Sequence, residues 1–269
     1  MKKCQSAKWW NGIVLSGIFV PIALVAGGGE VRFEPGVPVV PANHLKFYLH
    51  FSGPMERGDV FRYLRLVEVD TGGREIAEVP EPFREVELWD ETFTRLTLWF
   101  HPGRQKPGVN LNVEIGPILE KGGRYRLEIS EKWRMESGET LTKGSTHLFS
   151  AGAFDDIQPD PGTWRIEAIP EGVWIYTGEA LDPESLKKRI SVSRDKGKEL
   201  PAIRVVAESD GFWIRRDDGW ESGTYRLVVD PSLEDLAGNS VARPFNLDLE
   251  KAEGTAEVTG PVTLPFTVP

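Results

Sequence analysis

The sequence predicts an all-β protein made of two β-sandwich domains in tandem, behind an amino-terminal export signal. Short runs rich in β-branched and aromatic residues alternate with polar residues beyond residue 30. Turn-forming residues (28 Gly and 20 Pro) are scattered through the chain, and one motif recurs at a constant offset of 100 residues. Apart from a short turn at 182–189, no stretch has the helical period. The 269 residues are enough for two domains of ordinary size.

The amino-terminal segment, residues 1–29, has the three parts of a secretory signal peptide. A basic start is followed by an apolar run from Ile13 to Ala26 and then by three glycines. This run has 14 residues, whereas a membrane-spanning helix needs about 20. We therefore expect the amino-terminal segment to be cleaved off. The alternative is that it is retained as a membrane anchor. The predicted location is the periplasm, the cell surface or the extracellular space.

Charge and cysteine content exclude several classes of function. The formal net charge is −9, and without Lys2, Lys3 and Lys8 of the signal segment it would be −12, from 29 basic and 41 acidic residues. An acidic surface repels phosphate backbones, so we expect no nucleic-acid partner. The single cysteine, Cys4, lies in the signal segment. The exported chain is therefore expected to lack disulfides, thiolate metal sites and cysteine nucleophiles.

The repeat divides the rest of the chain into two copies of one unit. Gly123-Arg124-Tyr125-Arg126-Leu127 recurs as Gly223-Thr224-Tyr225-Arg226-Leu227, and Gly138 and Leu141 correspond to Gly238 and Val241. The predicted boundaries are 30–152 for the first sandwich, 153–163 for the linker, 164–250 for the second sandwich and 251–269 for a tail. The tail either adds an edge strand or stays loose.

The first copy contains an additional segment, and it is where we expect recognition to occur. Met55 and Gly123 are 68 positions apart, whereas Leu181 and Gly223 are 42 apart, so the first copy has about 26 additional residues, which we place within 78–119. Long loops on rigid sandwiches often carry binding sites. The predicted ligand- or partner-binding residues of this segment are Trp89, His101, Arg104 and Lys106. Trp89 would stack on a sugar or mark a protein contact, and the 101–110 loop would offer a basic tip to an anionic partner; a solvated hairpin tip is the alternative.

The acidic residues suggest one metal site, and nothing suggests catalysis. Asp155, Asp156 and Asp160 in the linker are oxygen ligands of the kind that calcium prefers, but they lack the spacing of a dedicated calcium loop. A solvated linker is therefore expected, with calcium as the alternative and no other cofactor. Asp235, Gly238 and Asn239 are predicted to form a turn rather than a metal site. No histidine pair has metal-ligand spacing and no Gly-x-Ser-x-Gly motif is present, so no catalytic residue is predicted.

Three motifs resemble the immunoglobulin-like modules of bacterial surface-layer and other envelope proteins (the SbsA type). The resemblance covers about residues 38–250 and depends on Phe51-Ser52-Gly53-Pro54-Met55-Glu56, Gly223-Thr224-Tyr225 and Asp235-Leu236-Ala237-Gly238-Asn239. The first copy departs from the pattern at 134–138, where the closing loop of the family is missing, and Thr177 stands where Phe51 stands in the first copy. The resemblance implies a seven-strand sandwich, export and a spacer or interaction role, and it implies no catalytic residue.

The sequence thus favours a non-catalytic exported protein that acts as a spacer or protein-interaction module of the cell envelope. The alternative is a carbohydrate- or matrix-binding module that uses Trp89 and the 101–110 loop. A hydrolytic enzyme is the third hypothesis. The expected partner is an envelope protein or polysaccharide, and the membrane is a partner only if the amino-terminal segment is retained.

Overall fold

The computed structural model describes residues 29–106, 108, 110–141, 145–169, 171–194, 197–245 and 259–269. Residues 1–28 of the predicted signal segment lie outside the described residues. The described chain is mostly β, with four sheets whose strand pairs are antiparallel except for one parallel pair, β2 with β9. This confirms the prediction of a mostly β protein and is consistent with two β-sandwiches. No helix of the described residues is long and apolar enough to cross a membrane.

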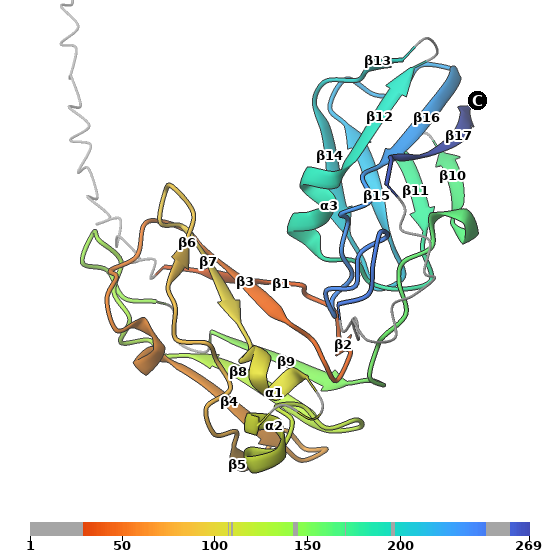
Figure 1. Cartoon of the computed structure of the whole chain (residues 1–269). Coiled ribbons are helices and arrows are strands. Elements are labelled where there is room, and N and C mark those ends of the chain that lie inside the picture. Colours follow the sequence, from red (N-terminus) through yellow and green to blue (C-terminus); the bar gives the residue numbers. More distant parts are fainter. Residues whose placement is uncertain are drawn as a thin grey trace, which may run out of the picture.

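The first half of the chain contains two sheets that enclose one hydrophobic core (Figure 1). One sheet has the order β1 (Val31–Glu34), β3 (Lys46–Phe51), β7 (Arg95–Trp99), β6 (Leu88–Trp89). The other has the order β2 (Val39–Val40), β9 (Thr146–Ala151), β8 (Arg124–Ile129), β4 (Leu64–Val69), β5 (Glu75–Glu78). Alternate residues of β8 are buried, as expected for a strand with one face on the core.

The second half repeats this arrangement with two further sheets and its own core. One sheet has the order β10 (Arg165–Ile169), β11 (Gly172–Tyr176), β15 (Gly211–Arg216), β14 (Ile203–Ala207). The other has the order β13 (Lys198–Glu199), β12 (Ile190–Arg194), β16 (Gly223–Val229), β17 (Val262–Val268). In Figure 1 the two halves are separate lobes that meet at an angle.

The repeat seen in the sequence is also a repeat of strand pairing. Leu66 pairs with Leu127 between β4 and β8, and Val192 pairs with Leu227 between β12 and β16. The residues predicted to form a tail include β17, which pairs with β16 from Gly223 to Val229. Of the two alternatives for the tail, residues 262–268 form the edge strand, so the second half extends beyond residue 250.

The helices are short and connect the strands. They are η1 (Val60–Tyr63), α1 (Pro102–Gln105), α2 (Asn110–Ile115), η2 (Pro161–Thr163) and α3 (Pro183–Arg189). Helix α3 is the helical turn that the sequence predicted. Asp182 caps it by accepting from the Ser185 N–H at 2.7 Å, proline occupies the first position, and basic residues fill the last turn. Helices α1 and α2 belong to the additional segment of the first copy.

Candidate functional site

The two halves meet at a seam, formed by β1 and residues 43–50 of the first half, by Asp155 of the linker, and by Glu179, α3 and the loop 233–241 of the second half. This loop, here called the closing loop, is shaped by Asp235, which accepts from the N–H groups of Ala237 (2.8 Å) and Asn239 (2.9 Å). Gly238 has a left-handed backbone, with φ 83°. The closing loop is therefore the turn that the sequence predicted.

The closing loop inserts an apolar side chain into the first half. Leu236 is only 4% exposed and belongs to the core cluster of the first half, although it lies in the second. Its carbonyl accepts from the Leu45 N–H at 3.1 Å and lies 3.1 Å from His44 Nδ1. Burial lowers the pKa of His44 to about 3, so its ring is neutral and Nδ1–H is the donor to this carbonyl.

Polar side chains of β3 contact α3 and the closing loop beside this insertion. The Tyr48 hydroxyl lies 3.0 Å from both carboxylate oxygens of Asp182, which is 1% exposed. Lys46 Nζ lies 2.8 Å from Glu234 Oε2 and 3.5 Å from Asp182 Oδ2. Burial acts to lower the pKa of Lys46, but these two carboxylates outweigh it and raise that pKa. Strand β3 is thus covered on both faces, by its own core and by the second half.

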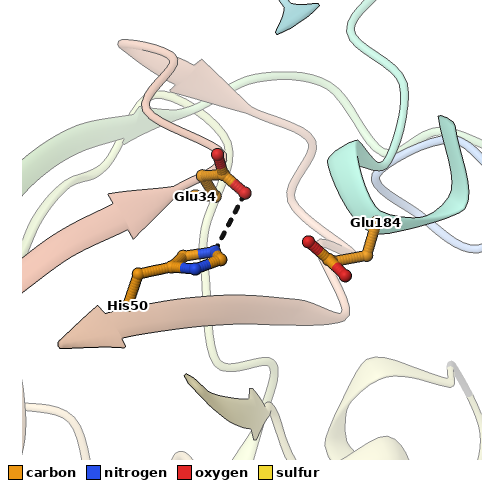
Figure 2. Close-up of side chains that lie close together, drawn as sticks. All are labelled: Glu34, His50 and Glu184. Carbon is orange, nitrogen blue, oxygen red and sulfur yellow. Dashed lines mark hydrogen bonds and ion pairs between the residues drawn. The ribbon is translucent and has the colours of Figure 1, made fainter. Parts of the chain in front are cut away.

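A second cluster of the seam has residue types that bind metals. Figure 2 shows Glu34 and His50 on β1 and β3, with the Glu184 carboxylate facing them from α3. His50 Nε2 lies 3.0 Å from Glu34 Oε2, and one ligand atom from each of the three residues lies within 4.8 Å of the others. Two carboxylates and an imidazole are a set that divalent transition metals accept.

Neighbouring basic side chains already compensate the negative charges of this cluster. The Lys187 ammonium lies 3.0 Å from Glu34 Oε2 and 2.7 Å from Glu184 Oε1, and Arg95 pairs with Glu184 across the seam. Burial acts to raise the pKa of Glu34, but hydrogen bonds from His50, Arg32 and Lys187 outweigh it and hold that pKa well below its usual range. An ammonium therefore bridges the carboxylates where a metal would, and the cluster acts as an electrostatic clamp between the halves.

A third cluster, Asp155, Glu179 and Asp235, lacks such compensation. Their carboxylates also lie within 4.8 Å of one another, and none of them takes part in an ion pair among the described residues. Burial and the neighbouring carboxylates raise the pKa of Glu179 to about 8. Burial also raises the pKa of Asp235 to about 7, against the hydrogen bonds from Asn239.

This arrangement includes only one of the three linker carboxylates that were the alternative calcium ligands. Asp155 joins the cluster, but Asp156 and Asp160 are exposed and do not. Asp160 instead accepts from the Gly162 N–H at 2.9 Å and caps η2. The oxygen ligands available for a hard cation are therefore those of Asp155, Glu179 and Asp235. Calcium binding here stays a prediction.

The residues predicted to bind a ligand or partner are used for packing. The Trp89 ring is half-buried, 5.8 Å from the Phe51 ring and 5.9 Å from the Trp133 ring, and its N–H donates to Glu87 at 2.9 Å. Trp89 therefore covers one end of the first core, because the additional segment folds back onto it, and the ring is not a free platform.

The predicted basic tip of the 101–110 loop is also corrected. Arg104 is 2% exposed, and its guanidinium donates to the carbonyls of Gly116 (3.0 Å) and Pro117 (2.8 Å). The His101 ring accepts from the Gly103 N–H at 3.2 Å and caps α1. Lys106 lies 4.8 Å from the ring centroid of Phe245, which follows the closing loop. Arg104 therefore fixes the loop to the first half and Lys106 contacts the second, while Gly108 and Asn110 are exposed.

Sequence reasoning missed Lys46, Tyr48 and Asp182 as seam residues. Lys46 and Tyr48 alternate with apolar residues of β3, which is typical of a solvent-facing strand surface. Asp182 has the sequence context of an ordinary helix cap. Only the position of the second half shows that these groups are buried together.

Comparisons with known proteins found no matching family model and no matching curated protein. Among solved structures, the chain is distantly similar to domains 1–6 of the surface-layer protein SbsC (13% identity, TM-score 0.31, covering 90% of this chain and 26% of that one). The crystal structure of the S-layer protein rSbsC(31-844) has 12% identity and a TM-score of 0.30, covering 75% and 24%. Native α2-macroglobulin from Escherichia coli, domains MG0-NIE-MG1, has 13% identity and a TM-score of 0.25, covering 74% and 64%. The chain spans about a quarter of the length of the surface-layer chains it matches.

Proposed function

We propose that this protein is a non-catalytic, exported spacer of the cell envelope, in which two immunoglobulin-like sandwiches are held in one fixed orientation. The observation that carries the proposal is the buried polar seam, where Tyr48 and Lys46 of the first half contact Asp182 and Glu234 of the second. Domains of one chain move relative to each other unless their interface is large and apolar or otherwise specific. A rigid pair suits a spacer because it fixes the distance between the attachments at its two ends.

The geometry of the seam explains why it would fix orientation. A buried charge that loses its partner costs about 3–5 kcal/mol, so rotation of one half against the other would be strongly unfavourable at Lys46 and Asp182. Leu236 adds an apolar anchor, because it leaves the first core if the halves separate. Recognition through Trp89 and the 101–110 loop is less well supported, since both are engaged within the molecule.

Rigidity can be tested by pulsed electron paramagnetic resonance on the full chain. In a Cys4→Ser background, spin labels are attached at Glu131→Cys in the first half and Asp217→Cys in the second, both of which are exposed positions. We expect one narrow distance distribution, which Lys46→Met broadens. The matched control, Lys132→Met at an exposed position, should leave it narrow. A broad distribution in the parent protein would contradict the proposal.

Export is tested separately by fractionation and amino-terminal sequencing of the protein made in an exporting bacterium. We expect the protein in the envelope or extracellular fraction, beginning near residue 27 to 30. Recovery of an intact chain in the cytoplasm would contradict the envelope role but not the rigidity of the pair.

A further inference from the structure

The outer face of the sheet β10-β11-β15-β14 carries a pair of tryptophans that the seam does not use. Alternate residues of β11 and β15 are buried in the second core, and the residues between them face outward. Trp174 pairs with Trp213 across these two strands, with ring centroids 5.1 Å apart and an interplanar angle of 50°. Both rings are only half-buried. The sheet therefore presents two adjacent indoles to solvent.

Two glycines help to fix the orientation of these rings. A Cβ atom at Gly211 would lie 2.9 Å from Cζ2 of Trp174, and one at Gly172 would lie 3.4 Å from Cε3 of Trp213. Each ring thus lies against a glycine of the neighbouring strand. A larger side chain at that glycine would collide with the ring. The pair is held in place before any ligand arrives, which reduces the entropy lost on binding.

Beside the rings lies a hollow of about 360 Å³ that contains acidic groups and no basic group. Its lining consists of Glu167, Ile169, Trp174, Glu208, Ser209, Asp210 and Trp213. The three carboxylates are exposed, and none takes part in an ion pair or a side-chain hydrogen bond among the described residues. Arg215 contacts Trp213 at 5.5 Å but does not line the hollow. The hollow thus complements a ligand that is positively charged and has an apolar face.

We propose that this hollow binds a saccharide whose sugar rings carry free amino groups, as in a de-N-acetylated amino-sugar polymer. The C–H face of a pyranose packs on an indole, and the negative faces of the two rings attract an ammonium group. The carboxylates of Glu167, Glu208 and Asp210 accept hydrogen bonds from ammonium and hydroxyl groups. The volume is within the range of small-ligand sites. A purely structural cross-strand pair would require no converging carboxylates.

The test is calorimetric titration of the full chain with four probes: fully deacetylated chitohexaose, its N-acetylated form, polygalacturonate and a lysine-rich peptide. We expect the deacetylated sugar to bind most tightly and more weakly as salt is added, the N-acetylated sugar to bind less tightly, and the anionic polymer not to bind. Trp174→Ala and Trp213→Ala should each weaken binding by about tenfold or more, as buried aromatic contacts do.

Carboxylate variants keep the proposal testable if the tryptophan variants fail to fold. Glu208→Gln and Asp210→Asn should weaken binding of the deacetylated sugar but leave the N-acetylated sugar nearly unchanged. Glu91→Gln, an exposed carboxylate in the first half, is the matched control and should change neither. The proposal is overturned if no sugar binds, if polygalacturonate binds, if folded tryptophan variants bind normally, or if a lysine-rich peptide binds more tightly than the sugar.

Discussion

The carboxylates of Asp155, Glu179 and Asp235 are the groups of the seam with the least electrostatic compensation. Asp235 is nearly fully buried, and its oxygens are already occupied by N–H groups of its own turn. Glu179 is half-buried and has no cation beside it. The folded chain therefore holds protons here that the unfolded chain releases at lower pH.

This difference predicts that stability falls as the pH rises. The pKa of Asp235 is raised from 3.8 to about 7, and that of Glu179 from 4.5 to about 8. The contribution of these two carboxyl groups to the free energy of unfolding is therefore complete below their ordinary pKa values. It is lost as the pH rises through their raised values in the folded chain. In EDTA, we expect the melting temperature to decrease between about pH 5 and 9, at about 2–4 °C for each kcal/mol lost in a chain of this size.

The variant Glu179→Gln should flatten this decrease, whereas Glu91→Gln should not change it. Repeating the series with calcium tests the calcium prediction, because a bound cation would stabilise the ionised carboxylates and raise the melting temperature at high pH. A melting temperature that rises with pH in EDTA would contradict the assignment of raised pKa values.

For single residues, the sequence predicted roles that depend on neighbouring residues. It missed contacts between residues that are far apart in the chain. The turn of Asp235 depends on neighbouring backbone N–H groups, and such a signal is local. The burial of Lys46 and Arg104 depends on segments that fold onto them, and no local pattern reports it. The solvent-exposed tip expected around Arg104 was wrong for that reason.

Among the elements, the glycine turns at Gly138 and Gly238 differ although the repeat aligns them. Gly138 and Gly238 both have a left-handed backbone, with φ 87° and 83°. A Cβ atom at Gly238 would lie 2.3 Å from Leu45 Cδ1, whereas nothing lies within 4 Å of one at Gly138. The same turn is thus open in the first copy and pressed against the other half in the second.

This contrast predicts unequal effects of the same substitution. Gly138→Ala should destabilise the protein by about 1–2 kcal/mol, the cost of a left-handed conformation for an L residue. Gly238→Ala should cost more, because the clash with Leu45 adds to the backbone strain. Urea unfolding measures the free energy of unfolding of both variants. Equal decreases would show that the Leu45 side chain moves aside at no energetic cost.

The strands were predictable because their alternation is a local property, and the repeat was predictable because it keeps its offset. The pairing of β17 was left open, since residues 262–268 contact β16 across more than 30 intervening residues. The additional segment was found because the two copies have unequal spacings between matching residues. These spacings did not predict that the segment packs against the core through Trp89.

Across the whole molecule, the closing loop contributes to both cores. Leu233 is fully buried in the second core, and Leu236, three positions later, is buried in the first. One loop thus couples the stability of the two halves. We expect a single calorimetric unfolding transition for the full chain, since the core of the first half is incomplete without Leu236 of the second.

The two leucines give a matched pair for testing this coupling. Each substitution to alanine should cost about 2–5 kcal/mol. Leu236→Ala should also separate the transition into two, whereas Leu233→Ala should lower the stability of the second half without creating a vacancy in the first. Differential scanning calorimetry resolves the transitions, and an undivided transition in Leu236→Ala would rule out coupling through this side chain.

The place of Leu236 also bears on the order in which the protein matures. A chain that emerges amino end first presents the first half before the residue that fills its core has arrived. Until residue 236 follows, the first half has an unfilled apolar site beside His44 and Leu45, open to chaperones or to a neighbouring chain. The first half therefore cannot reach its final packing until most of the second half has been made, although it is the first to be made.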